Sequence, residues 1–170
     1  SAEGPSATIV SGEGIRHVIV CRNDETSQTI IEGLTISEGL STTHSSEGYG
    51  GGLSCNESSP TIRSCHFTNN SGYQGGGCNV TLSNSLFSDC VFDENTATTE
   101  DGSYPWGGAM IIRGGNVVIE NSVFRNNTSS YVAAAIGCIG DAEGLVEIKN
   151  CQFENNSTLG IPVQGGAGGA

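Results

Sequence analysis

Two short motifs alternate four times along the chain, and this internal repeat constrains the fold more than any other feature. The first motif is Phe, two polar residues and Asn, at residues 67–70, 92–95, 124–127 and 153–156. The second is a triplet of Gly or Ala followed by an apolar residue, at 50–53, 75–78, 107–110 and 133–136. Successive Phe residues are 25, 32 and 29 positions apart, so the repeating unit is about the size of one supersecondary element.

Each period holds three short apolar segments. One follows the small-residue triplet, one contains a single aliphatic or aromatic residue, and one ends on the Phe itself. Apolar residues within a segment are two positions apart, which is the period of a β-strand, and no segment is long enough for a helix. Three short strands and three turns in one period predict one coil of a parallel β-solenoid.

We therefore expect an all-β fold of about six coils, each made of three short strands. The whole chain, 1–170, forms a single domain: clear repeats cover 29–156, a first coil covers 1–28, and 157–170 is a last partial coil or tail. General preferences for crossovers between parallel strands favour a right-handed coil.

Equivalent residues of successive coils should stack about 4.8 Å apart, at the spacing of neighbouring strands. This predicts two inward structural ladders. One continues from Ile36 through Phe67, Phe92, Phe124 and Phe153, and the other from Gly39 through Asn70, Asn95, Asn127 and Asn156. Asn suits tight turns, and stacked side-chain amides can bond along the axis. The Gly and Ala triplets suit a crowded corner.

The alternation of Phe-x-x-Asn with Gly-Gly-Ala-aliphatic resembles the repeat of the polymorphic outer-membrane proteins of chlamydiae. It is also similar to the wider group of right-handed parallel β-helix proteins of the pectin-lyase-like class. The resemblance covers about residues 29–156 and implies a single-stranded, right-handed parallel β-helix. Polymorphic membrane proteins are surface adhesins, so the resemblance also implies a cell-surface role. This chain departs from their repeat with two Gly-Gly-Gly triplets and one Ala-Ala-Ala triplet.

Composition excludes several functional classes. The chain has 6 basic and 18 acidic residues, for a net charge of −12. A strongly acidic chain without a basic stripe is a poor ligand for nucleic acids and for anionic membranes. No apolar run approaches the ~20 residues of a membrane-spanning helix. We expect no cofactor, because the Gly-rich segments lack the Lys-Ser/Thr and the following helix of a phosphate-binding loop.

The seven cysteines show no Cys-x-x-Cys spacing, so neither a zinc ribbon nor a thioredoxin motif is indicated. In the solenoid frame, Cys65 stacks on Cys90 and Cys21 on Cys55, within the Cα separation that a disulfide permits. We predict these two disulfides. The alternative is that all seven are free thiols packed as small apolar side chains.

Asn-x-Ser/Thr sequons occur at seven positions. Asn127 and Asn156 belong to the inward ladder, so we expect the better glycan acceptors elsewhere, at Asn56, Asn69, Asn79, Asn126 and Asn155. The alternative is that these asparagines serve only as turn residues without sugar.

Catalysis would need carboxylates gathered on one face. The candidates are Asp89, Asp93 and Glu94, with Arg63 and His66 one coil earlier. No recognisable catalytic motif accompanies them, and we favour their being solvated surface charges. His17, His44 and His66 are isolated in sequence and do not suggest a metal site. Tyr104 and Trp106 lie in a long loop and could contact sugar or pack on the solenoid.

The leading functional hypothesis is a non-enzymatic, extracellular structural or adhesive β-helix module. Both ends of a solenoid expose strand edges, so one chain could continue another, as a subunit of a surface filament. Partners would then be further copies of the chain, or cell-surface glycans or proteins. The alternative functions are a polysaccharide lyase or hydrolase and a carbohydrate-binding β-helix.

Overall fold

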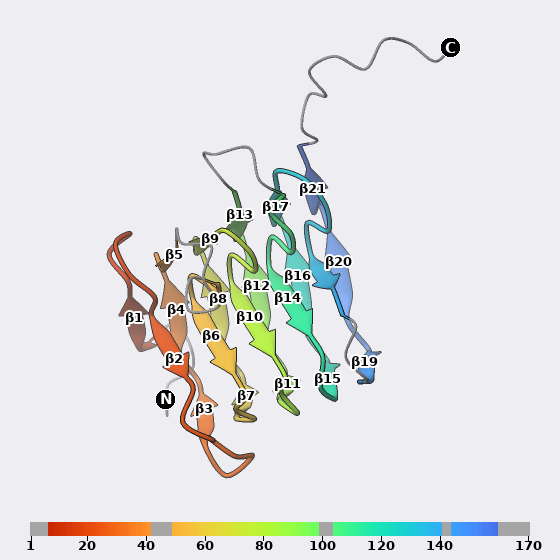
Figure 1. Cartoon of the computed structure of the whole chain (residues 1–170). Helices are drawn as coiled ribbons and strands as arrows, with labels where there is room; N and C mark the ends of the chain where they lie inside the picture. Colours follow the sequence, from red (N-terminus) through yellow and green to blue (C-terminus); the bar gives the residue numbers. More distant parts are fainter. Residues whose placement is uncertain (1–6, 42–48, 99–103, 141–143, 160–170) are drawn as a thin grey trace.

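A computed structural model describes residues 7–41, 49–98, 104–140 and 144–159 of the chain. They form a coil of short strands that stack into four parallel sheets, which we name A to D (Figure 1). The chain passes through sheets B, C, A and D in each turn, and turns that contain all four strands occur five times. An extra strand, β1, adds a partial sixth turn at the N-terminal end, close to the six coils expected.

The strands contain two to four residues each. Sheet A consists of β1 (Ile9–Ser11), β4 (Thr35–Ser37), β8 (His66–Thr68), β12 (Val91–Asp93), β16 (Val123–Arg125) and β20 (Gln152–Glu154). Sheet B consists of β2 (Ile19–Cys21), β6 (Leu53–Asn56), β10 (Cys78–Thr81), β14 (Met110–Arg113) and β18 (Ile136–Cys138).

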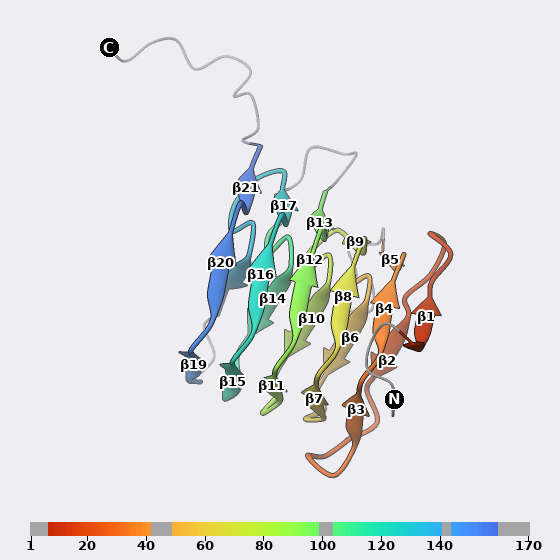
Figure 2. The same cartoon turned by 180° about the vertical axis from the view of Figure 1, so that it is seen from behind.

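Sheet C follows sheet B along the chain, and sheet D follows sheet A. Sheet C consists of β3 (Ile30–Glu32), β7 (Thr61–Arg63), β11 (Leu86–Ser88), β15 (Val117–Glu120) and β19 (Val146–Lys149). Sheet D consists of β5 (Leu40–Ser41), β9 (Ser71–Gly72), β13 (Thr96–Ala97), β17 (Thr128–Ser129) and β21 (Ser157–Thr158). Figure 2, seen from behind, shows sheet A as the near layer and sheet B as the far one. We expected three strands per coil; the fourth is the two-residue strand of sheet D, too short to carry a strand-like period.

The predicted Phe ladder is confirmed by the register of sheet A. Phe67 lies opposite Ile36 and Phe92, and Phe124 lies between Phe92 and Phe153. The rings of Phe67 and Phe92 are parallel within 3°, with centroids 4.7 Å apart, and those of Phe92 and Phe124 are 4.6 Å apart. Three of these rings are fully buried, so the ladder forms much of the core between the sheets.

The small-residue triplets fill a crowded corner, as predicted. Gly75 has a φ of +65°, a conformation that residues with a Cβ adopt at a cost. Gly76 lies so close to the next coil that a Cβ would sit 2.2 Å from the carbonyl oxygen of Thr96. A larger side chain at Gly76 would therefore push neighbouring coils apart.

Candidate functional site

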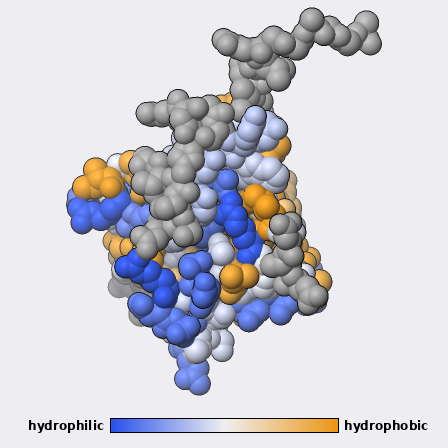
Figure 3. Space-filling model, viewed as in Figure 1, coloured by the Kyte–Doolittle hydropathy of each residue, from blue (hydrophilic) through white to orange (hydrophobic). Residues whose placement is uncertain are grey.

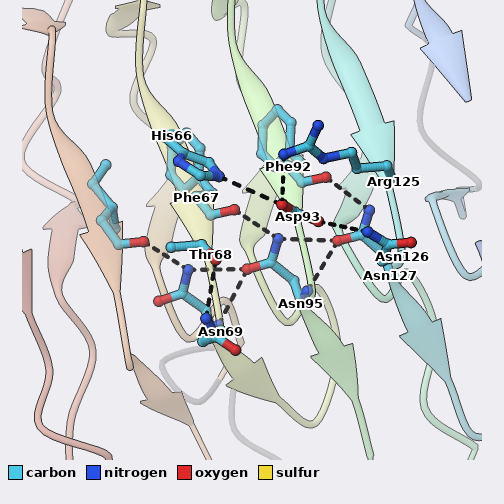
Figure 4. A network of polar contacts seen from close by, with 12 residues as sticks. His66, Phe67, Thr68, Asn69, Phe92, Asp93, Asn95, Arg125, Asn126 and Asn127 are labelled. Carbon is cyan, nitrogen blue, oxygen red and sulfur yellow. Dashed lines mark hydrogen bonds and ion pairs between the residues drawn. The ribbon is translucent and has the colours of Figure 1, made fainter. Parts of the chain in front are cut away.

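The catalytic candidates are divided between two faces of the solenoid. His66 and Asp93 lie on the outer side of sheet A, where Arg125 and Asn126 from the following coil join them (Figure 4). Arg125 Nη2 donates to Asp93 Oδ2 at 2.9 Å, and Asn126 Nδ2 donates to Asp93 Oδ1 at 3.0 Å. His66 Nε2 is 4.0 Å from Asp93 Oδ2. The Asp93 carboxylate thus bonds two side chains of the following coil, while His66 of the preceding coil lies beside it without a hydrogen bond.

This environment shifts the pKa values of both Asp93 and His66. Partial burial raises the pKa of Asp93, but the bonds from Arg125 and Asn126 outweigh it and the net pKa lies below its ordinary value. Burial lowers the pKa of His66, and the nearby Asp93 carboxylate only partly offsets this. The arrangement therefore favours an ionised Asp93 beside a neutral imidazole.

The remaining catalytic candidates do not join this group. Arg63 lies on sheet C, where its guanidinium contacts Glu32 of the preceding coil at 2.9 Å. Asp89 and Glu94 lie in the turns that flank β12, both with positive φ. Asp89, Asp93 and Glu94 are thus close in sequence but do not form one cluster, because β12 is only three residues long and the chain turns on both sides of it.

The Asn ladder is confirmed, and it is directional (Figure 4). Asn95 Nδ2 donates to Asn127 Oδ1 of the next coil and to the carbonyl of Phe67 in the preceding coil, both at 3.0 Å. Asn95 N–H donates to the same Asn127 oxygen. Asn70 makes the equivalent bonds to Asn95 and Ile36. Asn70, Asn95 and Asn127 thus each donate amide hydrogens to the carboxamide oxygen of the ladder Asn in the following coil.

The comparisons with known proteins agree with this geometry. The family model described as "Right handed beta helix region" matches residues 10–170, nearly the whole chain. The chain belongs to the right-handed β-helix family. No curated protein and no solved structure matches it, so the finer resemblance to chlamydial membrane proteins and pectin-lyase-like proteins stays a prediction.

The cysteines of the β-helix stack as predicted, but the two predicted disulfides are not formed. Cys21 of strand β2 lies opposite Cys55 of strand β6 in sheet B, and Cys65 and Cys90 immediately precede the paired residues His66 and Val91 of sheet A. All seven cysteines are free thiols. A hydrogen bond between the thiols lowers the pKa of Cys21 and raises that of Cys55. The alternative interpretation, cysteines packed as small apolar side chains, describes the structure better.

Positions of the predicted glycan acceptors differ widely. Asn69, Asn126 and Asn155 are exposed and occupy the same turn of three coils, each with a φ between 52° and 55°. Asn56 is half-buried at the end of β6. Asn79 is fully buried, so its choice as an acceptor is wrong for the folded chain. Asn79 alternates with the inward Cys78 and Val80 in β10, so it points outward from sheet B, and its backbone N lies close to Gly50 at the corner before β6.

The outer face of sheet B carries a polar and aromatic cluster that the sequence did not reveal. The Arg113 guanidinium lies 4.4 Å from the centre of the Tyr49 ring, which stacks on Tyr73 at 6.0 Å. Burial lowers the pKa of Arg113. Buried atoms of Gln74, Asn79 and Arg113 have no hydrogen-bond partner. Figure 3 shows hydrophilic and hydrophobic side chains side by side on this face.

Histidines and loop aromatics give no sign of a metal or cofactor site in the part of the chain that the structure describes. No group of three potential metal-ligating side chains occurs there, and no helix there is long and apolar enough to cross a membrane. The ring of His17 bonds the Gly50 carbonyl at 2.8 Å, and His44 lies outside the described residues. Tyr104 packs against Tyr131 at 4.7 Å, and Trp106 pairs with Val132.

Proposed function

We propose that the protein is a non-enzymatic structural or adhesive β-helix module that acts outside the cell or on its surface. The observation that carries this proposal is how the charged candidates are used. Asp93 bonds Arg125 of the next coil, and Glu32 bonds Arg63 of the next coil. Side chains that a hydrolase or lyase would need to gather around a substrate instead tie neighbouring coils together.

Exposed turns support the adhesive part of the proposal. A column of turn residues with positive φ, Glu38, Asn69, Glu94, Asn126 and Asn155, projects along one edge of the β-helix. Such a regular, rigid and mostly polar edge presents the same kind of contact at each coil. Repeated weak contacts give avidity when the partner is itself repetitive, as cell-surface glycans are.

The experiment is a cleavage assay paired with a binding assay. The purified chain is incubated with neutral and acidic polysaccharides, with and without calcium, and reducing ends and unsaturated products are measured. We expect no turnover, but saturable binding to cells or immobilised glycans. Turnover that disappears in Asp93→Asn or Asp89→Asn, with folding unchanged, would overturn the proposal in favour of a lyase or hydrolase.

A carbohydrate-binding β-helix is the second candidate, and the face of sheet B favours it. The half-exposed rings of Tyr49 and Tyr73 and the Arg113 guanidinium beside Tyr49 are of the kinds that bind sugars. Saccharide affinity that is lost in Arg113→Ala and kept in Arg63→Ala would assign binding to this face.

Glycosylation tests the extracellular assignment. Chain secreted from a eukaryotic host should carry glycan on the exposed Asn69, Asn126 or Asn155, and none on the buried Asn79. Peptide mapping with and without glycosidase gives the occupancy. A secreted chain without sugar at any sequon would remove glycoprotein from the proposal.

A further inference from the structure

The hydrogen bonds between coils end in unused donors at the C-terminal side of the described structure. In interior coils, the turn residue before the ladder Asn donates its N–H to the next strand of sheet A: Asn69 to the Asp93 carbonyl at 3.3 Å, and Asn126 to the Glu154 carbonyl at 3.0 Å. The equivalent donor in the last coil is the N–H of Asn155. It has no acceptor among the described residues.

Asn156 repeats this pattern at the end of the Asn ladder. Its Oδ1 accepts from Asn127, and its Nδ2 donates to the Phe124 carbonyl at 2.8 Å. Interior rungs also donate their N–H and a second Nδ2 hydrogen to the following coil. For Asn156 these two donors have no partner within the described ranges. At this end of sheet A, the amide donors of Asn155 and Asn156 are therefore placed as the donors of interior coils are, ready to bond the acceptors of one more coil.

The apolar part of this surface is equally incomplete. Phe153 is 48% exposed, whereas Phe67, Phe92 and Phe124 are fully buried. Its outer ring face lies at the end of the stack, since its inner face packs on Phe124 at 5.1 Å. A ring or aliphatic side chain one strand further along the axis would cover it.

The N-terminal end carries the complementary surface. Strand β1 extends sheet A one strand beyond the other three sheets, and its outer edge is unpaired in the described structure. Val10 occupies the Phe position of the register, opposite Ile36, and is 36% exposed; its neighbour Ile9 is 64% exposed. Ser11 is in register with Ser37, Thr68 and Asp93, so its carbonyl stands where interior carbonyls accept the turn N–H.

We propose that strand β20 of one copy pairs with strand β1 of a second copy, parallel and in register, so that sheet A continues from molecule to molecule. Phe153 then stacks on Val10 of the next copy, and the Asn155 N–H donates to its Ser11 carbonyl. The contact joins two different surfaces and leaves one of each free, so it propagates into a filament rather than closing into a dimer. This inference rests on the proposed structural role and identifies the partner as a second copy of the chain.

The test is sedimentation velocity of the 170-residue chain from about 1 µM to about 1 mM, where exposed strand edges associate. We expect the mean mass to rise steadily with concentration. Phe153→Asp blocks the β20 end, and Val10→Asp blocks the β1 end, so each variant alone should remain monomeric. Leu82→Asp is the matched control, since Leu82 is 52% exposed in a turn at neither end; this variant should associate like the parent.

Mixing the two blocked variants makes the test specific. Phe153→Asp keeps a free β1 end and Val10→Asp a free β20 end, so the mixture should form a one-to-one dimer and stop there. A parent chain that stays monomeric, blocked variants that still polymerise, or a mixture without dimer would each overturn the inference. None of these results bears on polysaccharide cleavage, so failure of the contact is distinguishable from failure of the proposed function.

Discussion

An interior coil and the last coil of this β-helix carry the same residue types at equivalent positions, but these residues differ in what they contact. Phe92 is fully buried between two parallel rings, whereas Phe153 has a ring on one side and is 48% exposed. Asn95 bonds both neighbouring coils, whereas Asn156 lacks an acceptor on its outer side among the described residues. A coil is therefore stabilised mainly by its contacts with the coils on both sides. The repeated Phe and Asn provide these contacts only where a neighbouring coil is present.

The Phe ladder should show this difference most strongly. Phe92→Ala opens a cavity inside the stack and should lower the free energy of unfolding by about 3–5 kcal/mol. Phe153→Ala removes a half-exposed ring and should cost about 1 kcal/mol. Urea denaturation followed by circular dichroism measures both. Equal losses would mean that the last coil is covered in solution.

The Asn ladder should give the next largest difference. Asn95→Ala leaves the Phe67 carbonyl and the donors of Asn70 without partners inside the protein, and we expect a loss of about 3 kcal/mol. Asn156→Ala leaves its partners closer to water, and about 1 kcal/mol is expected. The midpoints of urea unfolding compare the two. A cost for Asn156→Ala as large as that for Asn95→Ala would contradict the dependence on two neighbours.

The Asp93 network should give a smaller, pH-dependent effect. Because the pKa of Asp93 is lowered in the folded chain, the unfolded chain binds more protons near the ordinary value of 3.8. The stabilisation is therefore present above that pH and is lost as the pH falls through it toward the folded value. It should stay below about 1 kcal/mol, because Arg125 is largely exposed. Asp93→Asn should remove this part of the acid destabilisation, and Glu154→Gln in the last coil serves as the control.

Thiol reactivity should separate the same regions without any change in stability. Cys138 is exposed and Cys151 half-buried in the last turn, whereas Cys78 and Cys90 are buried in the interior. Burial raises the pKa of Cys90 to about 12, which leaves very little thiolate to react. A disulfide reagent followed by peptide mapping should therefore label Cys138 first and Cys90 only on unfolding. Finding three titratable thiols instead of seven in the denatured chain would restore the two disulfides.

The sequence was sufficient to predict the ladders because the same residue type, Phe or Asn, recurs at the equivalent position of successive coils. Phe92 and Asn95 could be assigned to the core from their repeats alone. The burial of Asn79 could not, because it lies between the inward Cys78 and Val80 on the outer side of β10, where an exposed side chain is expected. The partnership of Asp93 with Arg125 was missed for a similar reason: the two are 32 residues apart, and only the register of sheet A makes them neighbours.

The one-way Asn ladder has a consequence for how such a molecule could vary in length. Asn70, Asn95 and Asn127 each accept a hydrogen bond from the coil before and donate one to the ladder Asn of the coil after, so these interior rungs are interchangeable in this respect. If one whole coil were removed or duplicated, the Asn amide donors of one coil would again face the Asn carboxamide oxygen of the next coil at the new junction. A gene encoding this chain could therefore lengthen or shorten it by recombination between repeats, in steps of one coil, without designing a new junction.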